Sequence, residues 1–133
     1  MAGPPIAEAQ GTPGSLVQYY TDVALRKNGG SAVLLPLGLQ ENGGPDPRSK
    51  ELPRTQAHQY FASTGHNLSG AFLRYWQSTG GLSTWGPPIS EVKQRNGYTV
   101  QYCANAEFVL SGKSVVLGSV GARAWAALAV KGR

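Results

Sequence analysis

An ungapped internal repeat constrains the fold of this chain more than any other feature. Residues 14–38, GSLVQYYTDVALRKNGGSAVLLPLG, align with residues 97–121, GYTVQYCANAEFVLSGKSVVLGSVG, at a constant offset of 83. Nine of these 25 positions are identical: Gly14/Gly97, Val17/Val100, Gln18/Gln101, Tyr19/Tyr102, Gly29/Gly112, Ser31/Ser114, Val33/Val116, Leu34/Leu117 and Gly38/Gly121. Because self-similarity of this kind marks a recurring structural unit, the two segments are predicted to share one fold.

Each copy has the pattern of a β-hairpin. The stretches SLVQYY and YTVQYC alternate and are rich in β-formers, and later stretches end in AVLL and SVVL. The turns between them carry NGG and SGK, where glycine permits a positive φ. In the second copy EVKQ precedes a tight turn at Asn96-Gly97, which predicts one extra strand there.

The segment between the copies contains HNLSGAFLRYWQSTGGLSTWGPPISE, residues 66–91. The part LSGAFLRYWQSTGG predicts a helix that ends at Gly80-Gly81, with TWGPPISE as an extended turn because consecutive prolines cannot continue a helix. One face of this helix carries the larger side chains and would pack inward: Leu68, Phe72, Tyr75, Trp76 and Thr79. The first copy has no such helix and GGLxxWG turn ahead of it, so the chain is predicted to hold one and a half units.

These patterns divide the chain into five parts within one globular domain. We predict a flexible N-terminus (1–13), a half repeat (14–38), a Pro/Gly linker (39–58), a full repeat of helix, turn and hairpins (59–121), and a C-terminal helix (122–133). The C-terminal helix is expected to dock Trp125 and Leu128. The predicted class is α+β, with small antiparallel hairpins packed on one short aromatic-rich helix.

Composition narrows the classes of partner. The 12 Lys and Arg against 7 Asp and Glu give a net charge of +5, which favours an anionic partner. The basic residues are spread along the chain, however, whereas nucleic-acid binders concentrate them. We therefore do not expect nucleic acid, while an acidic cell-wall glycan stays open. No apolar run approaches the roughly 20 residues of a membrane span.

The single cysteine excludes some chemistry. Cys103 leaves no intrachain disulfide and no cysteine-based zinc site. The surrounding VQYCANAEF has no neighbouring histidine to activate the thiol, so a small buried thiol on a strand is predicted. With two histidines in the chain we expect no metal and no cofactor. The opening MAGPPIAEAQGTPG reads as an added Met before a mature secreted N-terminus, which predicts an extracellular protein whose signal peptide was removed.

Polar candidates for chemistry each have a structural alternative. His66 could be a general base or a ligand contact, but a histidine just before a helix more commonly bonds backbone groups or packs beside Trp76. No acidic residue forms a motif with it. Glu91 and Glu107 could form a glycosidase pair, or they could end a turn and sit on a strand face. We predict no catalytic residues and no enzyme activity. His58 is expected to be solvated.

Aromatic residues are the candidates for a sugar-stacking platform, since aromatic faces pack against pyranose C–H faces. The alternative is that they form the core, which we favour for Tyr75 and Trp76. Trp85, between a glycine-rich turn and Gly86-Pro87, is predicted to be partly exposed. The predicted ligand-binding residues are Trp85, Tyr98, Tyr102 and His66.

The stretch YFASTGHNLSGAFLRYWQSTGGLSTWGPPISE, followed by NGYTVQYCANAEFVL and VVLGSVG, resembles a repeat of secreted and surface proteins of bacteria. That repeat has forms like TGHxLxGxFLxYWxxxGGLxxFGYPISE followed by TVQYFxxAxFE and LGxLG, and it is distantly similar to the LGFP repeat of cell-wall-associated proteins. The resemblance covers residues 60–121, with a half unit at 14–38. Here Trp85 and Pro87 stand where Phe and Tyr are usual, and Cys103 replaces an aromatic. The resemblance implies a non-catalytic extracellular module. Our own leading hypothesis is that the module binds a cell-wall or other extracellular polysaccharide.

A second function stays open at this point. A lone half unit would leave unpaired strand edges, which invite pairing with another chain. Head-to-tail contacts of this kind build open filaments when the rotation does not close. The alternative is therefore a self-assembling subunit of a filament or surface layer, unless both copies pair within one chain.

Overall fold

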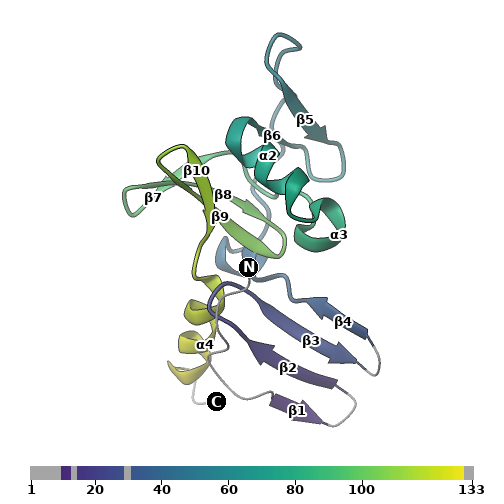
Figure 1. The fold of residues 1–133 in the computed structure, drawn as a ribbon, viewed down its shortest axis with the longest axis vertical. Coiled ribbons are helices and arrows are strands. Elements are labelled where there is room, and N and C mark those ends of the chain that lie inside the picture. Colours follow the sequence, from purple (N-terminus) through teal and green to yellow (C-terminus); the bar gives the residue numbers. More distant parts are fainter. Residues whose placement is uncertain (1–9, 13–14, 29–30, 131–133) are drawn as a thin grey trace.

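The computed structural model describes residues 10–12, 15–28 and 31–130, and these confirm the predicted α+β class. Small antiparallel sheets of two and four strands pack with four helices (Figure 1). Residues 1–9 of the predicted flexible N-terminus, Gly29-Gly30 of the NGG turn and the side chain of Leu128 lie outside the described part.

The first copy forms a four-stranded sheet followed by a short helix. Its strands are β1 (Gln10–Thr12), β2 (Ser15–Tyr19), β3 (Ala24–Asn28) and β4 (Ser31–Leu34), in the order β1-β2-β3-β4, and the helix is α1 (Leu37–Glu41). The copy is thus more than the predicted hairpin: β1 falls in the predicted N-terminus, and α1 begins before the predicted linker. The sequence pattern gives no clear sign of β3, because ALRKN mixes apolar and basic residues.

The second copy repeats that arrangement. Its strands are β7 (Lys93–Arg95), β8 (Tyr98–Cys103), β9 (Ala106–Ser111) and β10 (Ser114–Leu117), in the order β10-β9-β8-β7, and the helix is α4 (Val120–Val130). The predicted turn at Asn96-Gly97 is confirmed, with φ of 51° and 83°. The extra strand is not special to this copy, since β1 is the counterpart of β7.

Strand register follows the sequence offset in both copies. Val17 pairs with Gln10 and Arg26 in the first sheet, and Val100 pairs with Lys93 and Val109 in the second. Every one of these second-copy partners lies 83 positions after its first-copy counterpart. The repeat therefore defines two sheets of the same topology and register.

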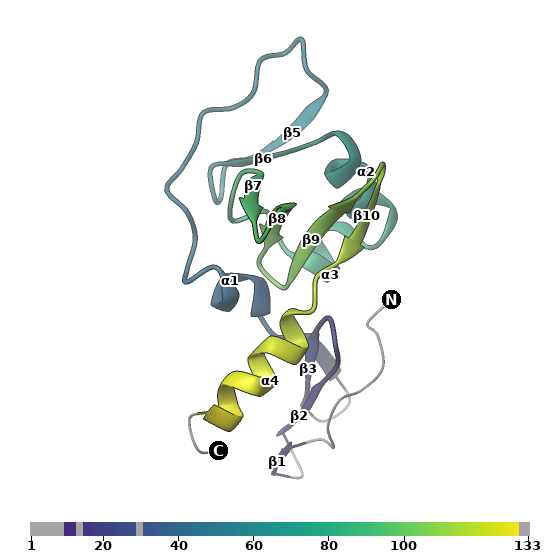
Figure 2. The ribbon, with the colours of Figure 1, turned by 90° about the vertical axis from the view of Figure 1, so that its left-hand side faces the viewer.

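A further layer packs on the second sheet, and the core that it forms there also includes Val23 of the first copy. It consists of the hairpin β5 (His58–Phe61) and β6 (His66–Ser69), followed by α2 (Gly70–Ser78) and α3 (Gly81–Trp85). Figures 1 and 2 show this layer beside β8–β10. We refer to residues 58–85 as the helix–hairpin layer.

The layer differs from its prediction in two places. The sequence predicts Leu68 in the helix, but Leu68 lies in β6. Its side chain is fully buried in that position. The helix ends as expected near Gly80 and Gly81, whose φ values are 128° and 58°. The chain then turns into α3 rather than directly into an extended turn, because GLSTW completes one helical turn before Gly86.

The two copies dock on each other through their helices. The Leu39 N–H in α1 donates to the Ala104 carbonyl in the β8–β9 turn at 2.9 Å, and the Ala122 N–H in α4 donates to the Thr21 carbonyl in the β2–β3 turn at 3.0 Å. Each bond satisfies an N–H of a first helical turn, which has no partner inside its own helix. Because the two contacts are equivalent under the offset, the copies form a pseudo-twofold pair within one chain.

Glycine makes this approach possible in both directions. A Cβ at Gly38 would overlap the carbonyl oxygen of Cys103, and a Cβ at Gly121 would overlap that of Tyr20. Leu37 and Val120, one residue earlier, are buried in the same core cluster. The predicted docking of the C-terminal helix through Trp125 is confirmed, as the centroid of its ring lies 5.3 Å from that of Tyr19.

The first prediction concerns this reciprocal contact. Gly38→Ala and Gly121→Ala should each lower the free energy of unfolding by about 1–3 kcal/mol, because the added methyl overpacks against backbone. Chemical denaturation measures both. Ala126→Val, on the exposed side of α4, should change stability by no more than about 0.5 kcal/mol. Tolerance of either glycine variant would contradict the reciprocal docking.

Candidate functional site

The stretch 66–91 forms the core of the second copy rather than an exposed binding face. Trp85 is 1% exposed, which corrects the prediction of partial exposure. Its indole lies edge-on to the Phe108 ring at 5.7 Å, and its Nε1–H donates to the Thr79 hydroxyl at 2.8 Å. The Gly-rich turn ahead of it forms α3, and this short helix turns the ring inward. Trp76 is likewise buried, as predicted.

His66 is fully buried and joins three segments. Its Nε2 donates to the Asp46 carbonyl at 3.0 Å, and its Nδ1 lies 2.8 Å from Oε2 of Glu91. The sequence has no acidic residue in a motif with His66, but folding brings Glu91 to it from 25 residues away. A carbonyl oxygen can only accept, so Nε2–H donates to Asp46, and Nδ1 faces the Glu91 carboxylate.

Asn67 extends this polar network. Its backbone N–H donates to Glu91 at 2.9 Å, and its side-chain amide donates to the Lys50 carbonyl and to Glu91. The Asn67 carbonyl accepts from the buried side chain of Gln101 at 2.8 Å, and Gln101 also donates to the Ser90 carbonyl. The network fastens the irregular segment before β5 and the PISE segment to β8. It leaves His66 in a structural role with no solvent-facing nitrogen.

Two other predicted features can be placed. Cys103 is fully buried, as predicted, and burial raises the pKa of its thiol, so it is not a ready nucleophile. His58 is not simply solvated. Hydrogen bonds to the Gln56 carbonyl and to Glu51 raise its pKa.

Of the four predicted ligand-binding residues, Tyr98 alone has an accessible ring. Its side chain is 61% exposed, whereas Tyr102, Trp85 and His66 are buried. Tyr98 lies at the rim of a hollow of about 190 Å³ on the second sheet. The hollow is lined by Arg95, Asn96, Tyr98, Val100, Glu107, Val109, Gly118 and Arg123. We call it the Tyr98 hollow.

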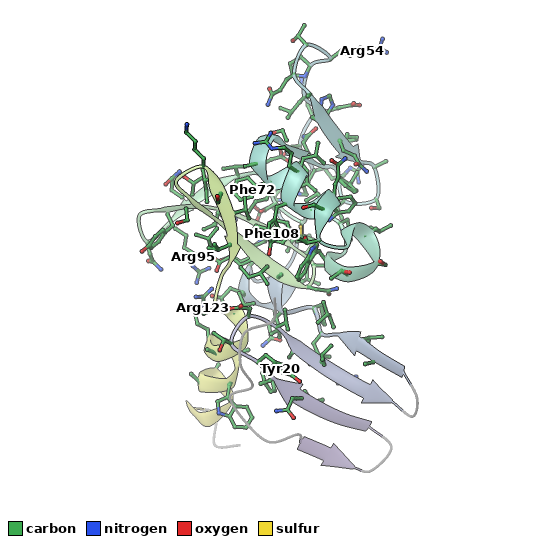
Figure 3. The ribbon with its side chains drawn as sticks, viewed as in Figure 1. Tyr20, Arg54, Phe72, Arg95, Phe108 and Arg123 are labelled. Carbon is green, nitrogen blue, oxygen red and sulfur yellow. The ribbon has the colours of Figure 1, made fainter. Side chains whose placement is uncertain are left out.

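Two arginines from different elements border the Tyr98 hollow. Figure 3 shows Arg95, on β7, and Arg123, on α4, on the same side of the molecule. Both guanidinium groups reach one oxygen of Glu41, with distances of 2.8 Å from Arg95 and 2.6 Å from Arg123. Arg123 also bonds Glu107 at 2.6 Å. Burial lowers the pKa of Arg123, but the bonds to Glu107 and Glu41 outweigh it and raise the pKa.

A second hollow of about 230 Å³ lies between α1 and α4. It shares Arg123 with the Tyr98 hollow and is otherwise lined by Leu37, Gln40, Glu41, Val120, Ala124 and Ala127. The two hollows therefore adjoin at Arg123.

The corresponding place in the first copy has none of this chemistry. Under the offset of 83, the first copy has Thr12 at the position of Arg95, Ser15 at that of Tyr98 and Ala24 at that of Glu107. It has Gln40 at the position of Arg123 and Leu35 at that of Gly118. Gly118 leaves room for the Glu107 carboxylate, which a Cβ would overlap. The first copy instead combines a small Ala24 with a larger Leu35. Since the same sheet folds without these charges, the charged cluster is not needed for the architecture.

Sequence reasoning named Tyr98 but missed the arginines and the hollow. Arg95 and Arg123 come from separate elements, β7 and the first turn of α4, and only folding brings both to Glu41 of α1. Comparing the copies position by position could have found them, because the charged residues stand out against uncharged counterparts. The same comparison reveals that Gly3-Pro4-Pro5-Ile6 and Glu8 match Gly86-Pro87-Pro88-Ile89 and Glu91, an upstream extension of the repeat.

The described residues contain no cluster of three or more His, Cys, Asp or Glu arranged to hold a metal ion. Within that same part of the chain, no helix has the length and apolar character needed to cross a membrane. Comparison of the chain with family models, with curated proteins and with solved structures found no match.

The second prediction tests the role of His66. His66→Ala should lower the free energy of unfolding by about 2–4 kcal/mol, since it opens a cavity and removes the hydrogen bonds of His66 to the Asp46 carbonyl and to Glu91. Denaturant unfolding gives the value. His58→Ala is the matched control and should cost clearly less, because Glu51 is largely exposed. Equal effects of the two variants would remove the special role of the buried network.

Proposed function

We propose that the chain is a non-enzymatic extracellular module of the bacterial cell surface that binds a glycan at the Tyr98 hollow. The surface location rests on the resemblance of residues 60–121 to bacterial surface repeats. The binding role rests on the hollow itself, where an exposed aromatic ring adjoins hydrogen-bonding groups. Sugars present both C–H faces and hydroxyl groups, so they suit such a combination.

This proposal depends mainly on the exposure of Tyr98 and on the different residue, Ser15, at the same position of the first copy. An exposed ring on a strand has no packing role of its own, and the first copy has Ser15 at the same place. The residues around Tyr98 also depart from the first copy in a coordinated way, with Gly118 making room for Glu107. Relative to the first copy, the second copy has added charged residues and lost a bulky side chain around one hollow. We take these paired differences to reflect binding of a ligand and not a structural need alone.

The charges around the hollow suggest how hydroxyl groups would be held. Arg95 and Arg123 keep about two-fifths of their side chains exposed while Glu41 and Glu107 fix them. A guanidinium fixed in this way presents its remaining N–H groups without losing side-chain entropy on binding. The basic net charge would add attraction to anionic wall polymers, and salt would screen that part.

The third prediction is a binding test. Isothermal titration against soluble peptidoglycan fragments and common extracellular polysaccharides should give binding that Tyr98→Ala weakens about tenfold or more, as stacking is lost. Tyr98→Phe keeps the ring and should retain most of the affinity. Leu82→Ala, at an equally exposed apolar residue on α3, should leave affinity unchanged. No heat with any glycan, or full binding by Tyr98→Ala, would refute this function.

Self-assembly remains the second candidate because of the two edge strands β4 and β10. Val33 on β4 and Val116 on β10 occupy equivalent positions, and their side chains are 55% and 48% exposed. Both strands are the outermost strands of their sheets. An edge strand with an exposed valine offers both backbone hydrogen bonds and apolar contact to a strand of another chain.

The fourth prediction separates this candidate from a monomeric binder. If edges pair, light scattering and negative-stain microscopy of the concentrated protein should show assemblies, and the double variant Val33→Lys with Val116→Lys should abolish them. Val92→Lys, at an exposed valine outside the strands, should leave assembly intact. A monomeric particle at every concentration would remove self-assembly from consideration.

A further inference from the structure

The second hollow, between α1 and α4, is formed by both copies of the repeat, and we call it the helix hollow. Leu37 of α1 and Val120 of α4 are counterparts under the offset of 83, and both line it. The residues that line the Tyr98 hollow, in contrast, all belong to the second copy. The helix hollow therefore depends on the docking of the two copies at Gly38 and Gly121.

Neither hollow alone has the volume of an ordinary ligand site. The Tyr98 hollow measures about 190 Å³ and the helix hollow about 230 Å³. Sites for small molecules usually measure about 300–1,000 Å³. Because the two hollows adjoin at Arg123, together they reach this range. Their size therefore favours one ligand that occupies both hollows over two ligands that each occupy one.

Arg123 links the two hollows. Its Nε–H donates to Glu41, which lines the helix hollow, and its Nη2–H donates to Glu107, which lines the Tyr98 hollow. Both distances are 2.6 Å, so the guanidinium group is held between the two carboxylates. The Arg123 side chain is still 42% exposed. A ligand that crosses from one hollow to the other would pass over a guanidinium group that is already in place.

The polar groups of the helix hollow suit the hydroxyl groups of a sugar. The amide of Gln40 donates and accepts hydrogen bonds, the carboxylate of Glu41 accepts them, and the guanidinium group of Arg123 donates them. A sugar hydroxyl also donates and accepts, whereas a phosphate or carboxylate group would meet Glu41 as a like charge. Among the described residues that line this hollow none is aromatic, so a sugar residue there would be held by hydrogen bonds and not by stacking.

We propose, resting on the proposed function of the Tyr98 hollow, that the ligand is a linear glycan with at least two consecutive sugar residues in the site. One sugar residue stacks on Tyr98. The next residue crosses Arg123 into the helix hollow, where Gln40 and Glu41 bond its hydroxyl groups. Tyr98 thus provides a contact that any sugar can make, and the helix hollow selects a chain over a single sugar.

The fifth prediction compares single sugars with chains. NMR titrations use N-acetylglucosamine and glucose, and then chitobiose, cellobiose and maltose with their tetrasaccharides. A disaccharide should bind about tenfold or more tightly than its single sugar, because the second residue adds contacts without a second loss of translational freedom. The amides of Arg95 and Tyr98 should shift with every saccharide that binds. The amides of Gln40 and Ala127 should shift only with the chains.

Two variants test the helix hollow by itself. Ala127→Leu narrows the hollow and Gln40→Ala removes its amide. Each should remove most of the gain in affinity for disaccharides while leaving the affinity for single sugars unchanged. Ala126→Leu and Gln77→Ala are the matched controls, because these exposed residues line neither hollow. Both controls should bind chains as the unchanged protein does.

Equal affinity for single sugars and chains would overturn the inference, and so would full binding of chains by both Ala127→Leu and Gln40→Ala. If Tyr98→Ala still weakens binding in that case, the proposed function stands and the helix hollow is not part of the site. No shift with any of these saccharides would also overturn the inference. The polysaccharide titrations of the third prediction then decide separately on the proposed function.

Discussion

Each copy of the repeat ends in a helix that docks on the strand turn of the other copy, and both contacts depend on a glycine. At Gly38 and at Gly121 the helix backbone meets turn carbonyls so closely that no side chain fits. The hydrogen bonds from Leu39 and Ala122 then satisfy amides that a helix cannot satisfy internally. Neither sheet would be positioned without the other, so this exchange fixes the relation of all the other elements.

The two copies differ in the elements and side chains that lie on the faces of their sheets. One face of the second sheet supports an aromatic core in which Tyr75, Trp85 and Phe108 contact one another edge-on or stacked. The polar residues of the same region, His66 among them, connect loops and strands. The other face bears the Tyr98 hollow. The residues proposed to bind a ligand, such as Tyr98, stand where the two copies differ in sequence, whereas the glycines that hold the copies together, Gly38 and Gly121, are the same in both.

Much of the fold could be predicted from the sequence because local signals were strong. The alternation of YTVQYC, the turn at Asn96-Gly97 and the glycines after α2 each act within a few residues. The partners of His66 and the exposure of Trp85 could not be predicted in that way. They depend on contacts between distant segments: Glu91 reaches His66 only after the chain reverses, and α3 turns the indole inward. The hollow depends on four segments, and its arginines carry no local pattern.

The reciprocal docking also has a kinetic consequence. Both helix-to-turn hydrogen bonds join segments from different halves of the chain. Neither can form until these distant segments have come together. Contacts between distant segments slow folding, because the entropy of closing long loops is lost before the contacts form. The first copy, made first by the ribosome, must wait for α4 at the far end before its β2–β3 turn is covered. We therefore expect the two copies to complete their docking together, late in folding.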